Sequence, residues 1–173
     1  MRVGVDTFTL RDLKLDVFQQ LDFIKRFGLE GAQFGGLRGL SVKLDGGQLK
    51  AVRARADELG LYSHVSVSVN CNPHLAGMPP DQHYQQLREE IEAAAACGWH
   101  ELHGSFGGGN ERYEHPVRWP QQMQDAADFI RRLGPVLRQH GSRLDIETHG
   151  DVSTFELIRV IEDTGPAIAG ICL

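Results

Sequence analysis

The chain has 173 residues, a formal charge of -5 from 18 lysines and arginines against 23 aspartates and glutamates, and a mean hydropathy of -0.29. This balance gives no basic surface for nucleic acid or an anionic membrane, and no apolar run approaches the roughly 20 residues of a membrane span. Three widely spaced cysteines exclude a disulfide framework, and nothing at the N-terminus resembles a signal peptide. We expect one cytoplasmic domain over residues 1–173 that binds a small molecule.

Six strand-like runs alternate with five stretches of helical apolar spacing. The strands are expected at 1–8, 31–35, 62–70, 100–105, 143–149 and 167–173, and the helical stretches at 17–24, 49–59, 87–94, 123–137 and 155–161. Each helical stretch is followed by a glycine suited to a left-handed cap, namely Gly28, Gly60, Gly98, Gly141 and Gly165. Strands that alternate with helices predict an α/β fold with parallel pairing. Pro135, inside the fourth helical pattern, predicts a kink or a break.

The predicted strands alternate between apolar and polar side chains. In the fifth, Leu144 and Ile146 alternate with Asp145, Glu147 and His149, and the first, third and fourth strands repeat the pattern. An open flavodoxin-like or Rossmann-like sheet would suit this length, but its inner strands are covered on both faces and are apolar nearly throughout. A parallel barrel with outer helices and a polar interior therefore fits the strands better.

The length provides only part of such a barrel. A (β/α)8 TIM barrel takes eight units and usually about 250 residues, whereas the pattern gives five βα units and a sixth strand. An apolar last strand without a covering helix would be an exposed sheet edge. We therefore predict a (β/α)8 TIM barrel truncated after strand six, unless a second copy covers that edge in a homo-oligomer.

Polar side chains stand at the C-terminal ends of the predicted strands, where parallel sheets and barrels bind ligands. They are Asp6, Gln33, Asn70, His103, Ser105, Glu147 and His149. Glu147 and His149 are two apart on a strand, so both are expected to project inward, where they could share a metal or bracket a substrate hydroxyl. A barrel-interior glutamate held by neighbouring hydrogen bonds is the alternative for this pair.

Residues 145–151, with the sequence Asp-Ile-Glu-Thr-His-Gly-Asp, precede a helix and then residues 169–173. This arrangement resembles strands five and six of the xylose-isomerase-like TIM barrel superfamily, which holds sugar phosphate isomerases and epimerases and AP endonuclease family 2. The resemblance implies that Glu147 is catalytic and binds a divalent metal ion (Mn²⁺, Mg²⁺, Co²⁺ or Zn²⁺). Together with the strand-end pattern, it leads us to predict that His149, His103, Asn70 and Asp6 contact the substrate.

The superfamily's other usual ligands lie on strands six, seven and eight and are not in this sequence, so the 173 residues alone are expected to be inactive. With those strands, the resemblance implies a metal-dependent isomerase or epimerase of a ketose or polyol-type substrate, acting through an enediolate. A dehydratase of an inosose-like or dehydroshikimate-like substrate and a non-catalytic flavodoxin-like binding domain are the alternatives. A DNA repair enzyme is disfavoured by the charge of -5.

The remaining candidates are expected to be structural. His64 near the start of the third strand predicts a hydrogen-bonded core histidine, and His74 and His115 predict solvated loop residues. Arg38 is expected at the surface, where it could meet a phosphate or carboxylate. Cys71 has no base partner and is given no nucleophilic role.

Overall fold

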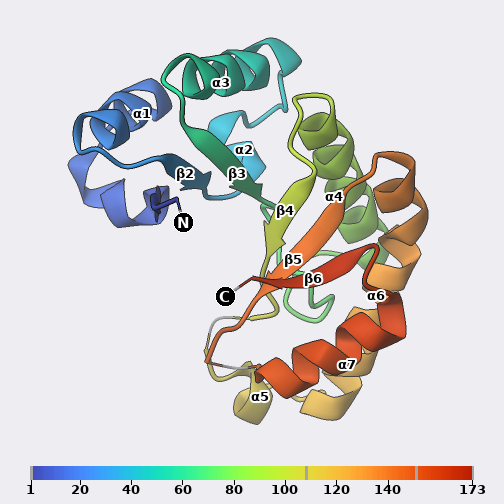
Figure 1. Ribbon diagram of the computed structural model, residues 1–173. Helices are drawn as coiled ribbons and strands as arrows, with labels where there is room; N and C mark the ends of the chain where they lie inside the picture. The colour runs from blue at the N-terminus through green and yellow to red at the C-terminus, as the bar shows by residue number, and fades with distance from the viewer. Residues whose placement is uncertain (1, 108, 151, 173) are drawn as a thin grey trace.

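The structure is a computed structural model that describes residues 2–107, 109–150 and 152–172. Its sheet is parallel and follows the chain order β1-β2-β3-β4-β5-β6. The strands are β1 Gly4–Asp6, β2 Gly31–Phe34, β3 Tyr62–Ser66, β4 Glu101–Gly104, β5 Arg143–Glu147 and β6 Ala169–Cys172. Figure 1 shows the sheet curving with its helices along the outer side. A doubly wound sheet reverses its strand order, so the flavodoxin-like alternative is wrong and the fold is that of a partial barrel.

Five longer helices cover the outer side of the sheet, as the apolar spacing predicts. They are α1 Val17–Arg26, α3 Gly46–Glu58, α4 Pro80–Ala95, α6 Trp119–Gln139 and α7 Thr154–Thr164. Three short elements, the 3-10 helix η1 Thr7–Leu13, α2 Leu37–Leu40 and α5 Glu111–Glu114, lie after β1, β2 and β4. The glycines predicted to end the helices all have positive φ, from 60° at Gly141 to 98° at Gly165. No helix in the described ranges is long and apolar enough to cross a membrane.

The helix α6 is continuous through Pro135, so of the predicted kink or break the break is wrong, and the kink stays a prediction. Proline removes one backbone donor from a helix interior, which costs stability. Leu133, Val136 and Leu137 around it are nevertheless at most 6% exposed. Burial of these side chains against the core offsets the lost hydrogen bond and keeps the last turn helical.

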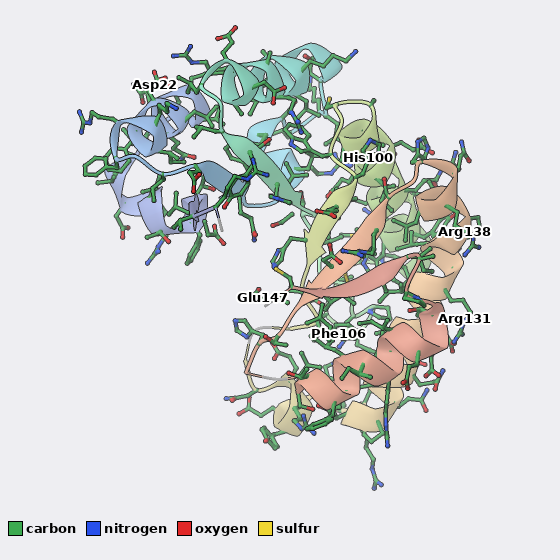
Figure 2. The ribbon with its side chains drawn as sticks, in the orientation of Figure 1. Asp22, His100, Phe106, Arg131, Arg138 and Glu147 are labelled. Atoms are coloured by element: carbon green, nitrogen blue, oxygen red, sulfur yellow. The ribbon has the colours of Figure 1, made fainter. Side chains whose placement is uncertain are left out.

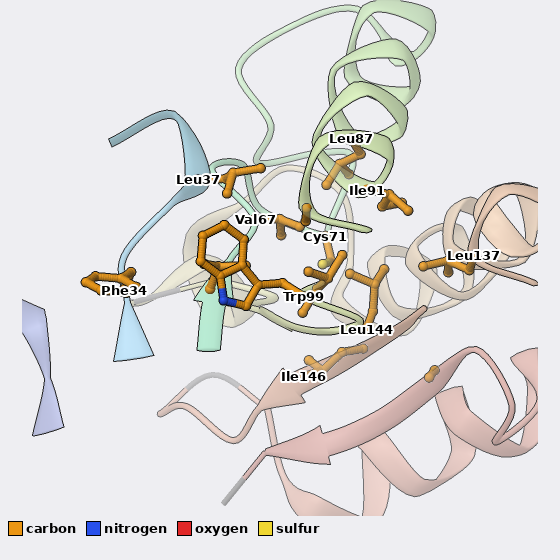
Figure 3. Close-up of a cluster of buried hydrophobic side chains, with 14 of the residues drawn as sticks. Phe34, Leu37, Val67, Cys71, Leu87, Ile91, Trp99, Leu137, Leu144 and Ile146 are labelled. Carbon is orange, nitrogen blue, oxygen red and sulfur yellow. The ribbon is translucent and has the colours of Figure 1, made fainter. Parts of the chain in front are cut away.

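The core lies between the outer face of the sheet and the helices. Leu102, Leu144 and Ile146 of the strands and Leu87 and Ile91 of α4 are at most 1% exposed. Figure 3 shows side chains of this cluster meeting between strands and helices. The apolar half of the predicted alternation thus faces outward, which leaves the polar half on the inner face.

The strands β1 to β5 end earlier than predicted, by one to four residues. β3 ends at Ser66 rather than at residue 70, and β5 ends at Glu147 rather than at residue 149. Beyond β3, the backbone N–H of Ser68 donates to the buried carboxylate of Glu90 at 2.6 Å. A side chain far away in the sequence therefore binds the donor at Ser68. Residues 1 and 173, at the ends of the first and last predicted strands, lie outside the described residues.

Candidate functional site

A hollow of about 430 Å³ opens on the inner face of the sheet. All six strands contribute to its lining, which consists of Gly4, Val5, Asp6, Gln33, Tyr62, His64, Glu101, His103, Asp145, Ile171 and Cys172. Most of these side chains are polar or charged, as the alternation predicts for the inner face of a barrel. We call this space the polar hollow.

Strand register arranges the inward side chains in rows. Direct partners across neighbouring strands form one row of Asp6, Gln33 and His64 and a second row of Ser66, His103, Asp145 and Gly170. Barrels usually fill such layers with Val, Ile and Leu. Because these rows are polar, the inner face forms a cavity suited to a hydrophilic ligand rather than a packed apolar core.

Glu147 and His103 meet at the C-terminal edge of the sheet. The distance from Glu147 Oε2 to His103 Nε2 is 3.4 Å, and the other ring nitrogen, Nδ1, lies 2.9 Å from Ser66 Oγ. The side chain of His103 is 15% exposed and that of Glu147 is 44% exposed. The imidazole is therefore fixed on both sides, while the carboxylate stays open to a ligand; Figure 2 labels Glu147 at the sheet edge.

Arg143 and Asp145 form a second polar group that the sequence analysis did not single out. Arg143 Nε lies 2.7 Å from Asp145 Oδ1, and a hydrogen bond to Asp145 raises the pKa of the guanidinium. A Cβ added at Gly170, the strand partner of Asp145, would overlap Asp145 Oδ1. The glycine therefore leaves the room that this ion pair occupies. The signal in the sequence was the polar alternation itself, which places residues 143, 145 and 147 on one face.

Of three residues predicted to contact the substrate, one lies on a strand and two lie beyond the end of a strand. Asp6 lines the polar hollow, and its Oδ1 accepts the backbone N–H of Phe8 at 2.8 Å, which caps η1. Asn70 lies beyond β3, where its Oδ1 accepts the N–H of Asn72. His149 is exposed and lies beyond the end of β5, so the prediction that Glu147 and His149 share one strand is wrong. Asn70 and His149 lie outside the strands because β3 and β5 end early. The substrate contacts of all three residues stay predictions.

Two further expectations about histidines are wrong. The side chain of His64 is 42% exposed and lies 4.0 Å from Glu101 Oε2, because it faces the polar hollow rather than the core. His74 is not simply solvated, since its Nε2 lies 2.6 Å from Asp125 Oδ2 on α6.

Arg38 and Cys71 have structural surroundings. Arg38 is bound within the chain, with Nε 3.0 Å from Glu90 Oε1 and Nη2 2.9 Å from Glu89 Oε2. Burial raises the pKa of Cys71 to about 12, so its thiol stays protonated, in agreement with the absence of a nucleophilic role.

Several acidic side chains lie near Glu147 at this edge of the sheet. Burial raises the pKa of the Cys172 thiol, and the charges of Asp145, Glu147 and Asp6 raise it further. The carboxylates of Asp145, Glu147 and Asp6 therefore lie near Cys172, and although Arg143 pairs with Asp145, carboxylate oxygens are donors that suit a divalent cation. No group of three or more histidine, cysteine or acidic side chains in the described ranges is placed to hold a metal. Glu147 thus fits the donor chemistry as one member of a larger ligand set.

A family model described as a xylose isomerase-like TIM barrel matches residues 21–173. The chain belongs to this family. This match confirms the resemblance seen in residues 145–151 and 169–173. Members of the family share the barrel architecture, of which this chain forms six strands.

Solved structures with the same fold include sugar epimerases. The chain is similar to a D-psicose 3-epimerase determined in the presence of D-fructose, with 12% identity, a TM-score of 0.73 and coverage of 91% of this chain and 57% of that one. For 3-keto-D-glucoside 4-epimerase from E. coli the identity is 17% and the TM-score is 0.65, with coverage of 86% of this chain and 59% of that one. For D-psicose 3-epimerase with D-tagatose from Clostridium cellulolyticum H10 the identity is 11% and the TM-score is 0.72, with coverage of 90% of this chain and 57% of that one. The chain therefore spans less than two thirds of these structures, and no curated protein matches it.

Proposed function

We propose that the protein is a divalent-metal-dependent sugar phosphate isomerase or epimerase that acts on a ketose or polyol-type substrate through an enediolate. The observation that carries the proposal is the pairing of Glu147 with His103 at 3.4 Å, at the C-terminal edge of adjacent strands and beside the polar hollow. The structural neighbours support a sugar substrate, since they are epimerases and two of them were determined with D-fructose or D-tagatose.

Glu147 would contribute one oxygen ligand to the metal, because its carboxylate stands at the edge and is 44% exposed. The bound cation would offset the negative charge that develops on the substrate oxygens when a proton is removed beside the carbonyl. His103 presents Nε2 toward Glu147 and can hydrogen-bond a substrate oxygen there, while Ser66 Oγ holds Nδ1. The polar rows beneath would hydrogen-bond sugar hydroxyls; Asp6, Asn70 and His149 are the predicted contacts.

The test is hydrogen exchange from solvent in the intact protein that contains this chain. The Mn²⁺-loaded protein is incubated in D₂O with D-fructose, D-psicose, D-tagatose and their phosphates, and deuterium at the carbon beside the carbonyl is followed by NMR. We expect exchange with at least one sugar and its loss in Glu147→Gln. Glu162→Gln, at an exposed position of α7, is the matched control.

Three outcomes would count against the proposal. Absence of exchange with every sugar, in protein shown to be folded and metal-loaded, would contradict proton abstraction beside a carbonyl. Rising ultraviolet absorbance with loss of water would instead identify a dehydratase. Equal exchange in Glu147→Gln and in the unchanged protein would remove Glu147 from the reaction.

A further inference from the structure

A second hollow, of about 600 Å³, lies on the outer side of the partial barrel among residues of α5, α6 and α7. Figure 1 shows α5 beside the beginning of α7 and close to the first turns of α6. Its lining includes three arginines, Arg112, Arg118 and Arg159, and the aromatic residues Tyr113 and Trp119. We call it the arginine groove. Among the described residues, none that lines it also lines the polar hollow.

One side of the arginine groove is held rigidly by Glu156. Its carboxylate accepts hydrogen bonds from Arg112 Nη1 at 2.9 Å, Arg112 Nη2 at 2.8 Å and Trp119 Nε1 at 2.9 Å. Burial opposes ionisation, but the hydrogen bonds from Arg112, Ser153 and Trp119 outweigh it and lower the pKa of Glu156 to about 2. The charges of Glu156 and Arg112 therefore compensate each other, and Glu156 is not available to the other arginines.

Arg118 and Arg159 have no such partner. Within residues 2–107, 109–150 and 152–172, neither guanidinium makes a hydrogen bond or an ion pair, although Arg112, Arg131 and many others do. The described lining holds two acids, Glu156 and Asp163, and neither carboxylate is hydrogen-bonded to Arg118 or Arg159. The three arginines of the described lining thus exceed its two acids, Glu156 and Asp163, by one positive charge, in a chain whose net charge is -5.

We propose that the arginine groove is a second ligand site that binds a small organic phosphate. Guanidinium groups present paired N–H donors that match phosphate oxygens, so Arg118 and Arg159 would take the anionic end. Tyr113 is 81% exposed and offers a flat ring to the organic part. The volume lies within the range of small-molecule sites, roughly 300–1,000 Å³.

The groove is also connected to the candidate site through the chain. Arg112 lies in the connection that follows β4, which carries His103, and Glu156 is in α7, which follows β5 and Glu147. The bidentate pair of Arg112 and Glu156 therefore joins the two segments that leave these strands. A ligand held beside that pair would stiffen both segments at once.

Binding is tested on the intact protein with pyrophosphate, AMP and glucose 6-phosphate, by calorimetry and by the fluorescence of Trp119. We expect a dissociation constant below about 1 mM for at least one of them and a loss of at least about tenfold in the double variant R118Q/R159Q. Arg138→Gln is the matched control, because Arg138 is an exposed residue of α6 outside the groove. Trp119→Phe should abolish the fluorescence change, since Trp119 lines the groove whereas Trp99 is buried against Ser63.

The three probes and one further variant decide the interpretation. Tighter binding of AMP than of glucose 6-phosphate would support stacking on Tyr113, and equal binding of all three would support recognition of the phosphate alone. Glu147→Gln should leave binding unchanged; loss of binding in that variant would place the phosphate in the polar hollow and overturn the proposal. Absence of binding at about 10 mM, or equal affinity in R118Q/R159Q shown to be folded, would overturn it as well.

Discussion

Ser66 Oγ lies 2.9 Å from His103 Nδ1, and the two residues are direct strand partners across β3 and β4. The contact fixes the ring so that Nε2 faces Glu147, 3.4 Å away. A hydrogen bond on the far nitrogen determines which tautomer an imidazole adopts and how it is oriented. The inward alternation of three adjacent strands therefore brings a hydroxyl, an imidazole and a carboxylate into one line.

Ser66→Ala should free the ring of His103 from its fixed orientation without unfolding the protein. Loss of one hydrogen bond costs about 1 kcal/mol of stability, while the ring of His103 gains rotational freedom. The ¹⁵N NMR shifts of the imidazole should move toward a mixture of tautomers, and Ser66→Thr should restore them. Unchanged shifts in Ser66→Ala would show that the serine does not orient His103. In the active protein we expect kcat to fall more than KM rises.

Gly170→Ala should destabilise the sheet. The added Cβ would overlap Asp145 Oδ1 and come within 3.1 Å of Arg143 Nε, so the ion pair must move. Overpacking of this kind costs about 1–3 kcal/mol. Urea unfolding measures the loss, with Gly39→Ala as the control because no atom lies within 4 Å of a Cβ built there. Equal stability of the two variants would mean that Asp145 and Arg143 rearrange freely.

Glu90 and Glu89 both form ion pairs with Arg38, but Glu90 is buried and Glu89 is exposed. Glu90 is fully buried and also accepts the N–H of Ser68, whereas the side chain of Glu89 is 61% exposed. Glu90→Ala leaves Arg38 Nε and the backbone donor of Ser68 without their acceptor, which should cost about 3–5 kcal/mol. Glu89→Ala should cost less than about 1 kcal/mol. Chemical denaturation of both variants checks the difference; similar losses would contradict the structural role of Glu90.

His83 should make stability depend on pH. Its Nε2 lies 2.8 Å from the carbonyl of Asn70, its ring stacks on Phe129 at 4.0 Å, and burial lowers its pKa. The unfolded chain therefore takes up a proton more readily below the ordinary histidine pKa of about 6.5, so the free energy of unfolding should fall as pH decreases from there. Urea midpoints between pH 5 and 8 measure this trend. His83→Gln keeps a hydrogen-bond donor but cannot titrate, so the urea midpoint should depend less on pH. An unchanged pH dependence in this variant would show that other groups cause it.

The helices and the two faces of the sheet could be predicted because their signals are local. Gly28 and Gly165 end helices by their own backbone freedom, and Leu144 and Ile146 alternate with Asp145 and Glu147 within one strand. The same alternation correctly placed Glu147 and His103 at one edge. Such patterns need no knowledge of which segments meet in space.

The strand ends and the structural polar groups could not be predicted, because they depend on contacts between distant segments. The donor at Ser68 binds Glu90, 22 residues further along the chain, so β3 ends before Asn70. Arg112 and Glu156 are separated by 44 residues, and nothing in either segment indicates the other. Pro135 shows the same effect, since burial of α6 outweighs a strong local helix breaker.

Mn²⁺ binding to the intact protein tests the central claim, that Glu147 on the inner face is a ligand of a catalytic cation. Electron paramagnetic resonance of the free ion, titrated with the unchanged protein and with Glu147→Gln, measures the affinity directly. We predict one Mn²⁺ per chain and a loss of affinity of at least about tenfold in Glu147→Gln, because the variant removes a charged oxygen ligand. Equal affinity of the two proteins for Mn²⁺ would contradict the account.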